Sequence, residues 1–414
     1  IPVGVWHDDG VYALVGRALA EGHGFSYQGV VGAPPAVKFP PVYPSFIAGL
    51  WWTFGDVGAV TLAATLSNVL FLAVEGSLLA WGVRAAAGVP RPMALAAGGL
   101  AAVSADVLRT SSAVLSEPLF LLLATGCLAS WVAVETRDGG RGTKLWLVVA
   151  ALMLITVWTR AAGLALVAGF GLAALLKHGP RTAALVAVPP LVAWAGWSAW
   201  AAARGAVIPA DLADLLGPYE GWLREQVVHD PVGFAARLPG HVVGVLERTF
   251  VLWLPRTGGA WLWLAGLPLA GLVGAGWVTA RRKWPPLAWS ALAYFGLLVL
   301  WPYLDRRLVV PFHFLTVALM AMGVVWLGER TAPAWARRVS LSVALLWVSF
   351  FSVVTTHRIA VQWPTSAYRI RAERMAAGVE ALGRIVPPGG VVGAPEFWAG
   401  LNLHGGWTVA PSVL

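Results

Sequence analysis

The chain has 414 residues, of which 58% are hydrophobic and only 12% are charged, and its formal net charge is +9. A soluble domain of this length could not keep so much apolar surface from water, so the composition indicates a polytopic membrane protein. The basic residues form short clusters between apolar runs, as the positive-inside rule expects, which argues against nucleic acid as a partner. One cysteine, Cys127, excludes an intrachain disulfide.

Residues 1–56 precede the first long apolar run and are polar only in places. Within them, residues 9–20 predict a helix that places Tyr12, Val15 and Leu19 on one face, so that it could lie flat at the membrane interface. The prolines of KFPPVYP (38–44) should break any helix there. SFIAGLWWTF, which follows, predicts a second interfacial helix with a tryptophan belt.

Apolar runs of roughly 17 to 25 residues predict about ten membrane-spanning helices in the rest of the chain. Their expected bounds are 57–83, 92–109, 115–134, 145–159, 161–177, 183–203, 259–280, 285–303, 308–328 and 339–356. Basic connectors assign alternate ends to the cytoplasmic side, which leaves residue 1 outside and predicts a further span before it.

The same pattern divides the chain into outer segments and membrane-spanning segments. The expected organisation is an outer loop with interfacial helices and an acidic motif (1–56), transmembrane helices (57–203), an outer loop with amphipathic helices near 212–228 and 234–250 (204–258), transmembrane helices (259–357), and an outer C-terminal segment that begins a truncated α/β domain (358–414).

Two adjacent carboxylates, Asp8 and Asp9, open the first predicted helix in WHDDG (6–10). One interpretation is helix capping, because carboxylates at a helix start accept unpaired N–H groups and complement the dipole. The other is a general base with a metal- or hydrogen-bonding partner at the boundary of water and lipid. His7 and His23 flank the pair and could help ligate a divalent ion, although their spacing is not that of a metal motif.

Several stretches, taken in order, resemble the GT-C-type membrane glycosyltransferases, the polyprenyl-phosphate-sugar-dependent enzymes grouped with protein O-mannosyltransferases and the lipid A aminoarabinose transferase. The stretches are HDDGVYALVGRALAEGHGFSYQG (7–29), KFPPVYPSFIAGL (38–50), LSEPLFLLL (115–123), WTRAAGLAL (158–166) and YLDRRLVVP (303–311). The resemblance covers most of residues 6–330. It departs from the family pattern at the acidic pair, which is Asp-Asp here where many relatives have Asp-Glu.

The resemblance implies an all-α polytopic fold: a GT-C-like transmembrane bundle with extracytoplasmic juxtamembrane helices and a small C-terminal domain. It implies an inverting glycosyltransferase in the cell (inner) membrane that moves a sugar from a polyprenyl-phosphate donor to a glycan, lipid or protein on the extracytoplasmic face. Asp8 would be the general base and Asp9 its catalytic neighbour, with Tyr12 and His7 in support and a divalent metal ion as a possible cofactor. Two alternatives stay open, namely a non-catalytic GT-C-like subunit of a larger membrane complex and a transporter.

Such an enzyme would need cations to hold the donor phosphate and to steady it as it departs. The basic residues at the outer ends of the predicted spans are the candidates: Lys38, Arg109, Arg160, Arg306 and Arg307. The alternative for each is that it extends to lipid headgroups, and Asp305 could pair with the last two.

Glu117, between Ser116 and Pro118, has two interpretations of its own. It is either the first-turn acid of a helix or a second acid that faces the cavity beside Asp8.

Overall fold

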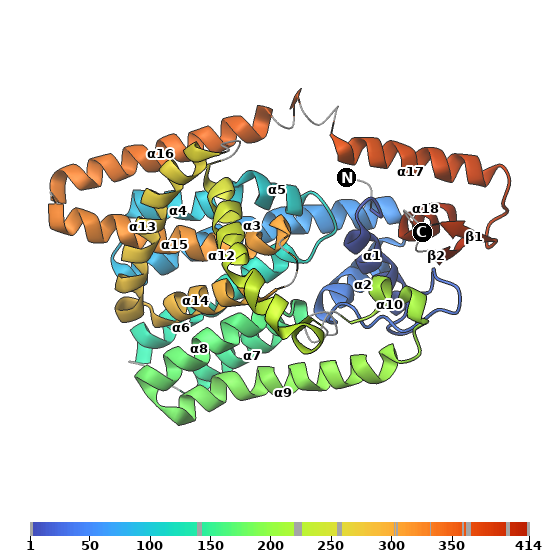
Figure 1. The fold of residues 1–414 in the computed structure, drawn as a ribbon, viewed down its shortest axis with the longest axis horizontal. Coiled ribbons are helices and arrows are strands. Elements are labelled where there is room, and N and C mark those ends of the chain that lie inside the picture. Colours follow the sequence, from blue (N-terminus) through green and yellow to red (C-terminus); the bar gives the residue numbers. More distant parts are fainter. Residues whose placement is uncertain are drawn as a thin grey trace.

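The computed structural model describes residues 3–138, 143–218, 226–254, 259–301, 303, 305–331, 333–357, 360–361, 366–394 and 398–411, apart from some side chains within helices. Most of these residues are helical, and Figure 1 shows a broad bundle with the N- and C-terminal segments together at its right-hand end. The expected all-α polytopic fold is confirmed.

The main bundle begins at α3. Its helices are α3 (Val57–Ala87), α4 (Arg91–Val103), α5 (Ala105–Ser111), α6 (Glu117–Asp138), α7 (Thr143–Thr159), α8 (Gly163–His178), α9 (Pro180–Gly205), α13 (Ala260–Lys283), α14 (Pro285–Leu300), α15 (Arg306–Thr331) and α16 (Pro333–His357). Between α9 and α13 lie η1 (Ala210–Leu212), α10 (Ala213–Leu216) and α12 (Pro231–Trp253). The amphipathic piece expected near 234–250 lies in α12, whereas much of the one expected near 212–228 falls outside the described residues.

Within the described residues, five helices are long and apolar enough to cross a membrane: α3, α6, α9, α13 and α15. Helices α4 and α5 would form a sixth span, bent by 55°, and α7, α8 and α14 are shorter apolar helices. Every predicted span thus coincides with a helix or with this bent pair. On α9 large apolar side chains such as Leu191 and Val192 are exposed, as expected for a helix that faces lipid.

Close helix contacts in the bundle occur where glycines meet. A Cβ on Gly276 of α13 would collide with the Leu319 carbonyl of α15, and one on Gly98 of α4 would collide with the Gly76 carbonyl of α3. Lipid tails are as apolar as leucine, so association in a membrane depends on such close packing.

Helix α1 (His7–Ala20) begins two residues before the expected start and is not a helix that lies flat on lipid. It is buried over most of its length, packed against α2 (Val42–Phe54) on one side and the C-terminal α18 on another. Small residues permit this, because Gly16 lies against Ile47 of α2 and Gly10 lies against Ala399 of α18. Tyr12 and Val15, which were expected to lie on lipid, are instead covered by protein.

Helix α2 also corrects the expectation for KFPPVYP, because the helix begins at Val42 and includes Pro44. A proline in the first helical turn removes no intrahelical hydrogen bond, so the proline-rich stretch ends in the helix instead of excluding it.

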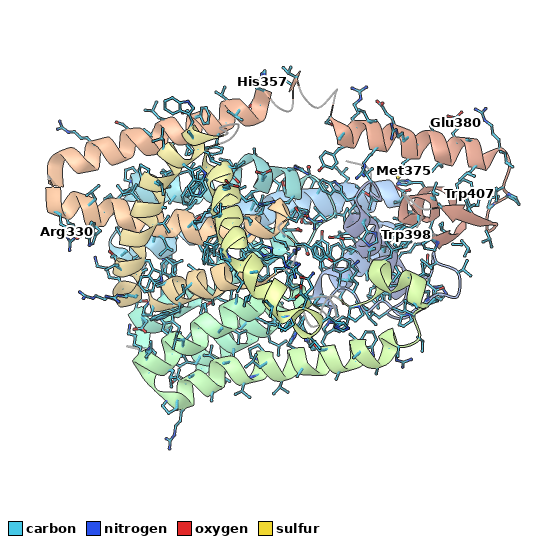
Figure 2. The ribbon with its side chains drawn as sticks, viewed as in Figure 1. Arg330, His357, Met375, Glu380, Trp398 and Trp407 are labelled. Atoms are coloured by element: carbon cyan, nitrogen blue, oxygen red, sulfur yellow. The ribbon has the colours of Figure 1, made fainter. Side chains whose placement is uncertain are left out.

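The C-terminal segment comprises α17 (Ala367–Gly383), β1 (Val391–Ala394), α18 (Trp398–Gly405) and β2 (Thr408–Pro411). The strands are parallel, with Val391 opposite Thr408. Val30 of the first outer loop forms a parallel bridge with Val409, and the Val409 amide donates to the Gly29 carbonyl at 2.8 Å. Figure 2 shows Trp398 and Trp407 in this unit, with Met375 of α17 nearby. The first outer loop and the C-terminal segment therefore form one packed region.

Candidate active site

Four charged side chains from widely separated segments meet at one place. Asp8 lies in the first turn of α1, Glu117 opens α6, Arg160 lies between α7 and α8, and Arg307 is the second residue of α15. Each stands at or beside a helix end. We call Asp8, Glu117, Arg160 and Arg307 the ion-pair cluster.

Arg307 joins the two carboxylates of the ion-pair cluster. Its Nη1 donates to Asp8 Oδ2 at 2.9 Å, while its Nε and Nη2 donate to Glu117 Oε1 at 3.0 and 2.7 Å. Glu117 is fully buried, whereas the side chains of Asp8 and Arg307 are each 16% exposed. Charge-assisted bonds of this length are the strong kind. The guanidinium is therefore fixed on its inner side and accessible on its outer side.

Arg160 provides the second cation, and Ser116 positions it. Arg160 Nη1 lies 3.1 Å from Glu117 Oε1 and donates to Ser116 Oγ at 2.9 Å. The Ser116 hydroxyl also shares a hydrogen bond of 2.9 Å with the buried Tyr12 hydroxyl of α1. Two carboxylates and two guanidiniums thus balance, as charges buried this deeply must.

The surroundings of Asp8 keep it ionised. Burial raises the pKa of Asp8, but the charge of Arg307, with smaller contributions from His7 and Lys38, outweighs burial and holds the pKa below its ordinary value. His7, in contrast, is uncharged, because burial and then the Lys38 charge lower its pKa to about 4. His7 is therefore neutral at pH 7.

Lys38 lies close enough to influence both groups without belonging to the ion-pair cluster. Its Nζ donates to the Leu215 carbonyl at 2.8 Å, and its side chain is 7% exposed. That bond fixes the ammonium against α10, where its charge lowers the pKa of Asp8 and of His7.

The adjacent carboxylates, expected as a pair in one site, are divided by the fold. Asp9 is fully buried, and its Oδ1 accepts from the Gly10 amide at 2.7 Å, whereas Asp8 bonds Arg307. Burial raises the pKa of Asp9 well above its ordinary value. Trp6 and not an aspartate occupies the N-cap position, and it makes no side-chain capping bond. The Asp8 side chain is thus partly exposed, whereas Asp9 is not.

Arg109, another of the candidate cations, lies over two aromatic rings. The Arg109 guanidinium lies over the Trp6 ring at 4.9 Å and the Tyr368 ring at 4.6 Å, and it bonds the Tyr368 hydroxyl. Arg307 also lies over Trp6, at 5.8 Å, so this one ring contacts both arginines. The side chain of Arg306 lies outside the described residues.

Sequence reasoning missed Trp6, Ser116 and Tyr368 as parts of this region. Ser116 directly precedes Glu117, and Trp6 lies two residues before Asp8, which was a usable signal. Tyr368 lies on a separate helix, α17, and only the fold brings it to Trp6, where the rings stack at 4.3 Å.

The residues around Asp8 do not fit the divalent metal ion that the sequence allowed. Among the described residues, no three His, Cys, Asp or Glu side chains gather so as to hold a metal ion. Arg307 lies between Asp8 and Glu117, the two carboxylates that a metal would need. The positive charge between these acids is supplied by the chain itself.

The same fold occurs in known membrane glycosyltransferases. The Archaeoglobus fulgidus oligosaccharyltransferase matches in its complex with Zn and sulfate with a TM-score of 0.56 at 12% identity, over 98% of this chain and 58% of that chain. ArnT from Cupriavidus metallidurans in the apo state matches with a TM-score of 0.53 at 15% identity, over 97% of this chain and 80% of that one.

The apo form of the oligosaccharyltransferase has a TM-score of 0.53 at 11% identity, and the chain covers 61% of its length. No family model and no curated protein matches the chain by sequence. The GT-C resemblance is therefore confirmed at the level of the fold.

Proposed function

We propose that the protein is a GT-C-type glycosyltransferase that moves a sugar from a polyprenyl-phosphate donor to an acceptor at the extracytoplasmic face of the cell membrane. The observation that carries the proposal is the ion-pair cluster: a partly exposed carboxylate, Asp8, beside two fixed guanidiniums, in a fold shared with such enzymes. The archaeal relative AglB has been solved with an inhibitory peptide and a dolichol-phosphate, which supports a lipid phosphate as the ligand class.

Asp8 has the properties that a general base requires. It is ionised, it is partly exposed, and the turn of α1 holds it in place. A sugar on a lipid phosphate already has a good leaving group, so the protein needs to deprotonate the acceptor and to stabilise the departing phosphate. Attack by the acceptor from the face opposite the phosphate would invert the anomeric centre.

Arg307 and Arg160 are the groups suited to the phosphate. Both are anchored by Glu117, so they need no reorganisation as negative charge develops on the leaving group. Tyr12 acts through Ser116 and Arg160 as a positioning residue. The Lys38 charge lowers the pKa of Asp8.

The test uses the purified protein in proteoliposomes with a panel of polyprenyl-phosphate sugars and a cell-envelope extract as acceptor. Release of polyprenyl phosphate is the readout. Asp8→Asn should lower the rate by about a hundredfold or more, the usual scale for loss of a general base. Asp9→Asn is the matched control and should keep most of the activity, because Asp9 is buried away from the ion-pair cluster.

Full activity of Asp8→Asn would contradict the assignment of the base. A wild-type protein that consumes no donor in the panel would favour the non-catalytic subunit.

A further inference from the structure

Arg307 holds its two carboxylate partners unequally. Two of its nitrogens, Nε and Nη2, bond Glu117, and only Nη1 bonds Asp8. Glu117 is fully buried and is also contacted by Arg160, whereas the Asp8 side chain is partly exposed. The contact of Arg307 with Glu117 therefore consists of two bonds and is buried. Its contact with Asp8 is a single bond and is partly exposed to water.

The two contacts consequently differ in how readily they exchange. Removing a partner from a buried charge is strongly unfavourable, because the remaining charge stays out of water without compensation. An ion pair near solvent is worth much less and can be replaced by another anion. A phosphate that approaches from the open side would compete with Asp8 for Arg307, while Glu117 keeps the guanidinium in position.

We propose that Arg307 masks Asp8 in the free protein, and that the phosphate of the donor lipid displaces the Asp8 carboxylate and so releases it to act as the base. This inference rests on the function proposed above and adds to it an order of events. Donor binding itself generates the competent base, and a protein without donor does not activate water at Asp8.

The chemistry balances around this exchange. The acceptor O–H bond breaks and its proton passes to the released Asp8 carboxylate, while the acceptor oxygen forms a bond to the anomeric carbon. The bond from that carbon to the phosphate oxygen breaks, and its electron pair leaves with the phosphate, whose charge faces Arg307. Protonated Asp8 is neutral and no longer competes for the guanidinium until product leaves.

The ring of Trp6 helps to keep Arg307 in place during the exchange. It lies 5.8 Å from the guanidinium and is stacked on Tyr368 on helix α17. An aromatic face attracts a cation without offering it a proton acceptor, so Trp6 restrains Arg307 without competing with the phosphate.

A binding experiment without any sugar tests the proposal. Wild type and variants are placed in nanodiscs that contain a chelator and increasing amounts of decaprenyl phosphate, and the bound fraction is measured by native mass spectrometry. Asp8→Asn should bind the lipid phosphate on the order of tenfold more tightly, because a competing carboxylate is gone and a tenfold change corresponds to the loss of one modest ion pair.

Asp305→Asn is the matched control. Asp305 accepts the backbone N–H of Arg307 at 2.9 Å and is exposed, so this variant removes one negative charge close by but does not free the guanidinium. It should leave lipid binding unchanged. Equal tightening in both variants would show a general charge effect and would overturn masking.

Whether Asp8→Asn tightens or weakens binding of the lipid phosphate decides whether Asp8 competes for Arg307. If Asp8 bound the phosphate through a cation other than Arg307, its loss would weaken binding, and unchanged or weaker binding overturns the proposal.

Arg307→Gln should abolish binding, with Arg307→Lys as the variant to use if the glutamine protein does not fold. Competition with inorganic phosphate separates the sources of the ligand, because only the lipid form should bind at micromolar concentrations if the membrane supplies it.

The donor-consumption assay separates failure of this inference from failure of the proposed function. Tighter binding by Asp8→Asn together with no sugar transfer by wild type would support masking of a phosphate site and would reject the transferase. Transfer by wild type together with unaltered binding by Asp8→Asn would support the transferase and would reject masking.

Discussion

Consecutive residues in the first turn of α1, Asp8 and Asp9, lie in different chemical surroundings. On one side Asp8 meets Arg307 in a partly exposed cluster of ion pairs; on another, Gly10 faces the tightly packed C-terminal unit, and Asp9 is fully buried. The first side depends on charged residues of α6 and α15, Glu117 and Arg307. The second depends on Gly10, which has no side chain and so allows close packing. The comparison shows that close packing elsewhere on a helix can hold a partly exposed carboxylate in place.

The largest effect is expected at the centre of the ion-pair cluster. Glu117→Gln would leave the two guanidiniums of Arg307 and Arg160 near each other with only Asp8 to balance them. The free energy of unfolding should fall by about 3 to 5 kcal/mol, as for other buried pairs that lose one partner. Chemical denaturation in detergent, followed by intrinsic tryptophan fluorescence, measures the change.

Glu75→Gln is the control for that experiment. Glu75 is equally buried, but its Oε1 accepts from the Thr125 hydroxyl at 3.4 Å, a bond that glutamine can keep. A loss as large as that of Glu117→Gln would show that burial of any glutamate matters and that the ion pairs do not.

The packed side of α1 should respond less. A methyl group on Gly10 would collide with Ala399 of α18, so Gly10→Ala should lower the free energy of unfolding by about 1 to 3 kcal/mol. Gly49→Ala in α2 is the matched control, since nothing lies within 4 Å of its Cβ position. There alanine should be neutral or slightly stabilising. Thermal unfolding of both variants gives the comparison, and equal shifts would contradict the proposed close contact.

A further effect is confined to acid pH. The pKa of His7 is about 4 in the folded protein against 6.5 for the model compound, so the unfolded chain binds the proton first as pH falls. The stability that neutral His7 contributes is present above pH 6.5 and is lost between pH 6.5 and 4, with a slope of at most about 1.4 kcal/mol per pH unit. His7→Gln should flatten this part of the curve of stability against pH. An unchanged acid slope would show that His7 is accessible to protons in the fold.

Much of the ion-pair cluster could be anticipated from the sequence, and the reason is topological. Asp8, Glu117, Arg160 and Arg307 all lie at outer ends of predicted helices, and alternating spans must bring such ends to one side of the membrane. Their mutual distances could not be anticipated, since the run of apolar residues does not encode which helices are neighbours. The same limit explains why Asp9 was paired with Asp8: adjacent residues on a helix point about 100° apart, and only the packing partners decide which direction is open.

The sequence by itself determined that the chain is a polytopic membrane protein, where its helices lie, and which charged residues stand at their outer ends, because hydrophobicity and charge act locally along the chain. Tertiary structure decided the rest. It buried α1 between α2 and α18, separated Asp9 from Asp8, placed Arg307 between two acids, and brought Tyr368 to Trp6. Each of these depends on contacts between residues far apart in sequence, whose geometry is set by close packing and by the need to pair every buried charge.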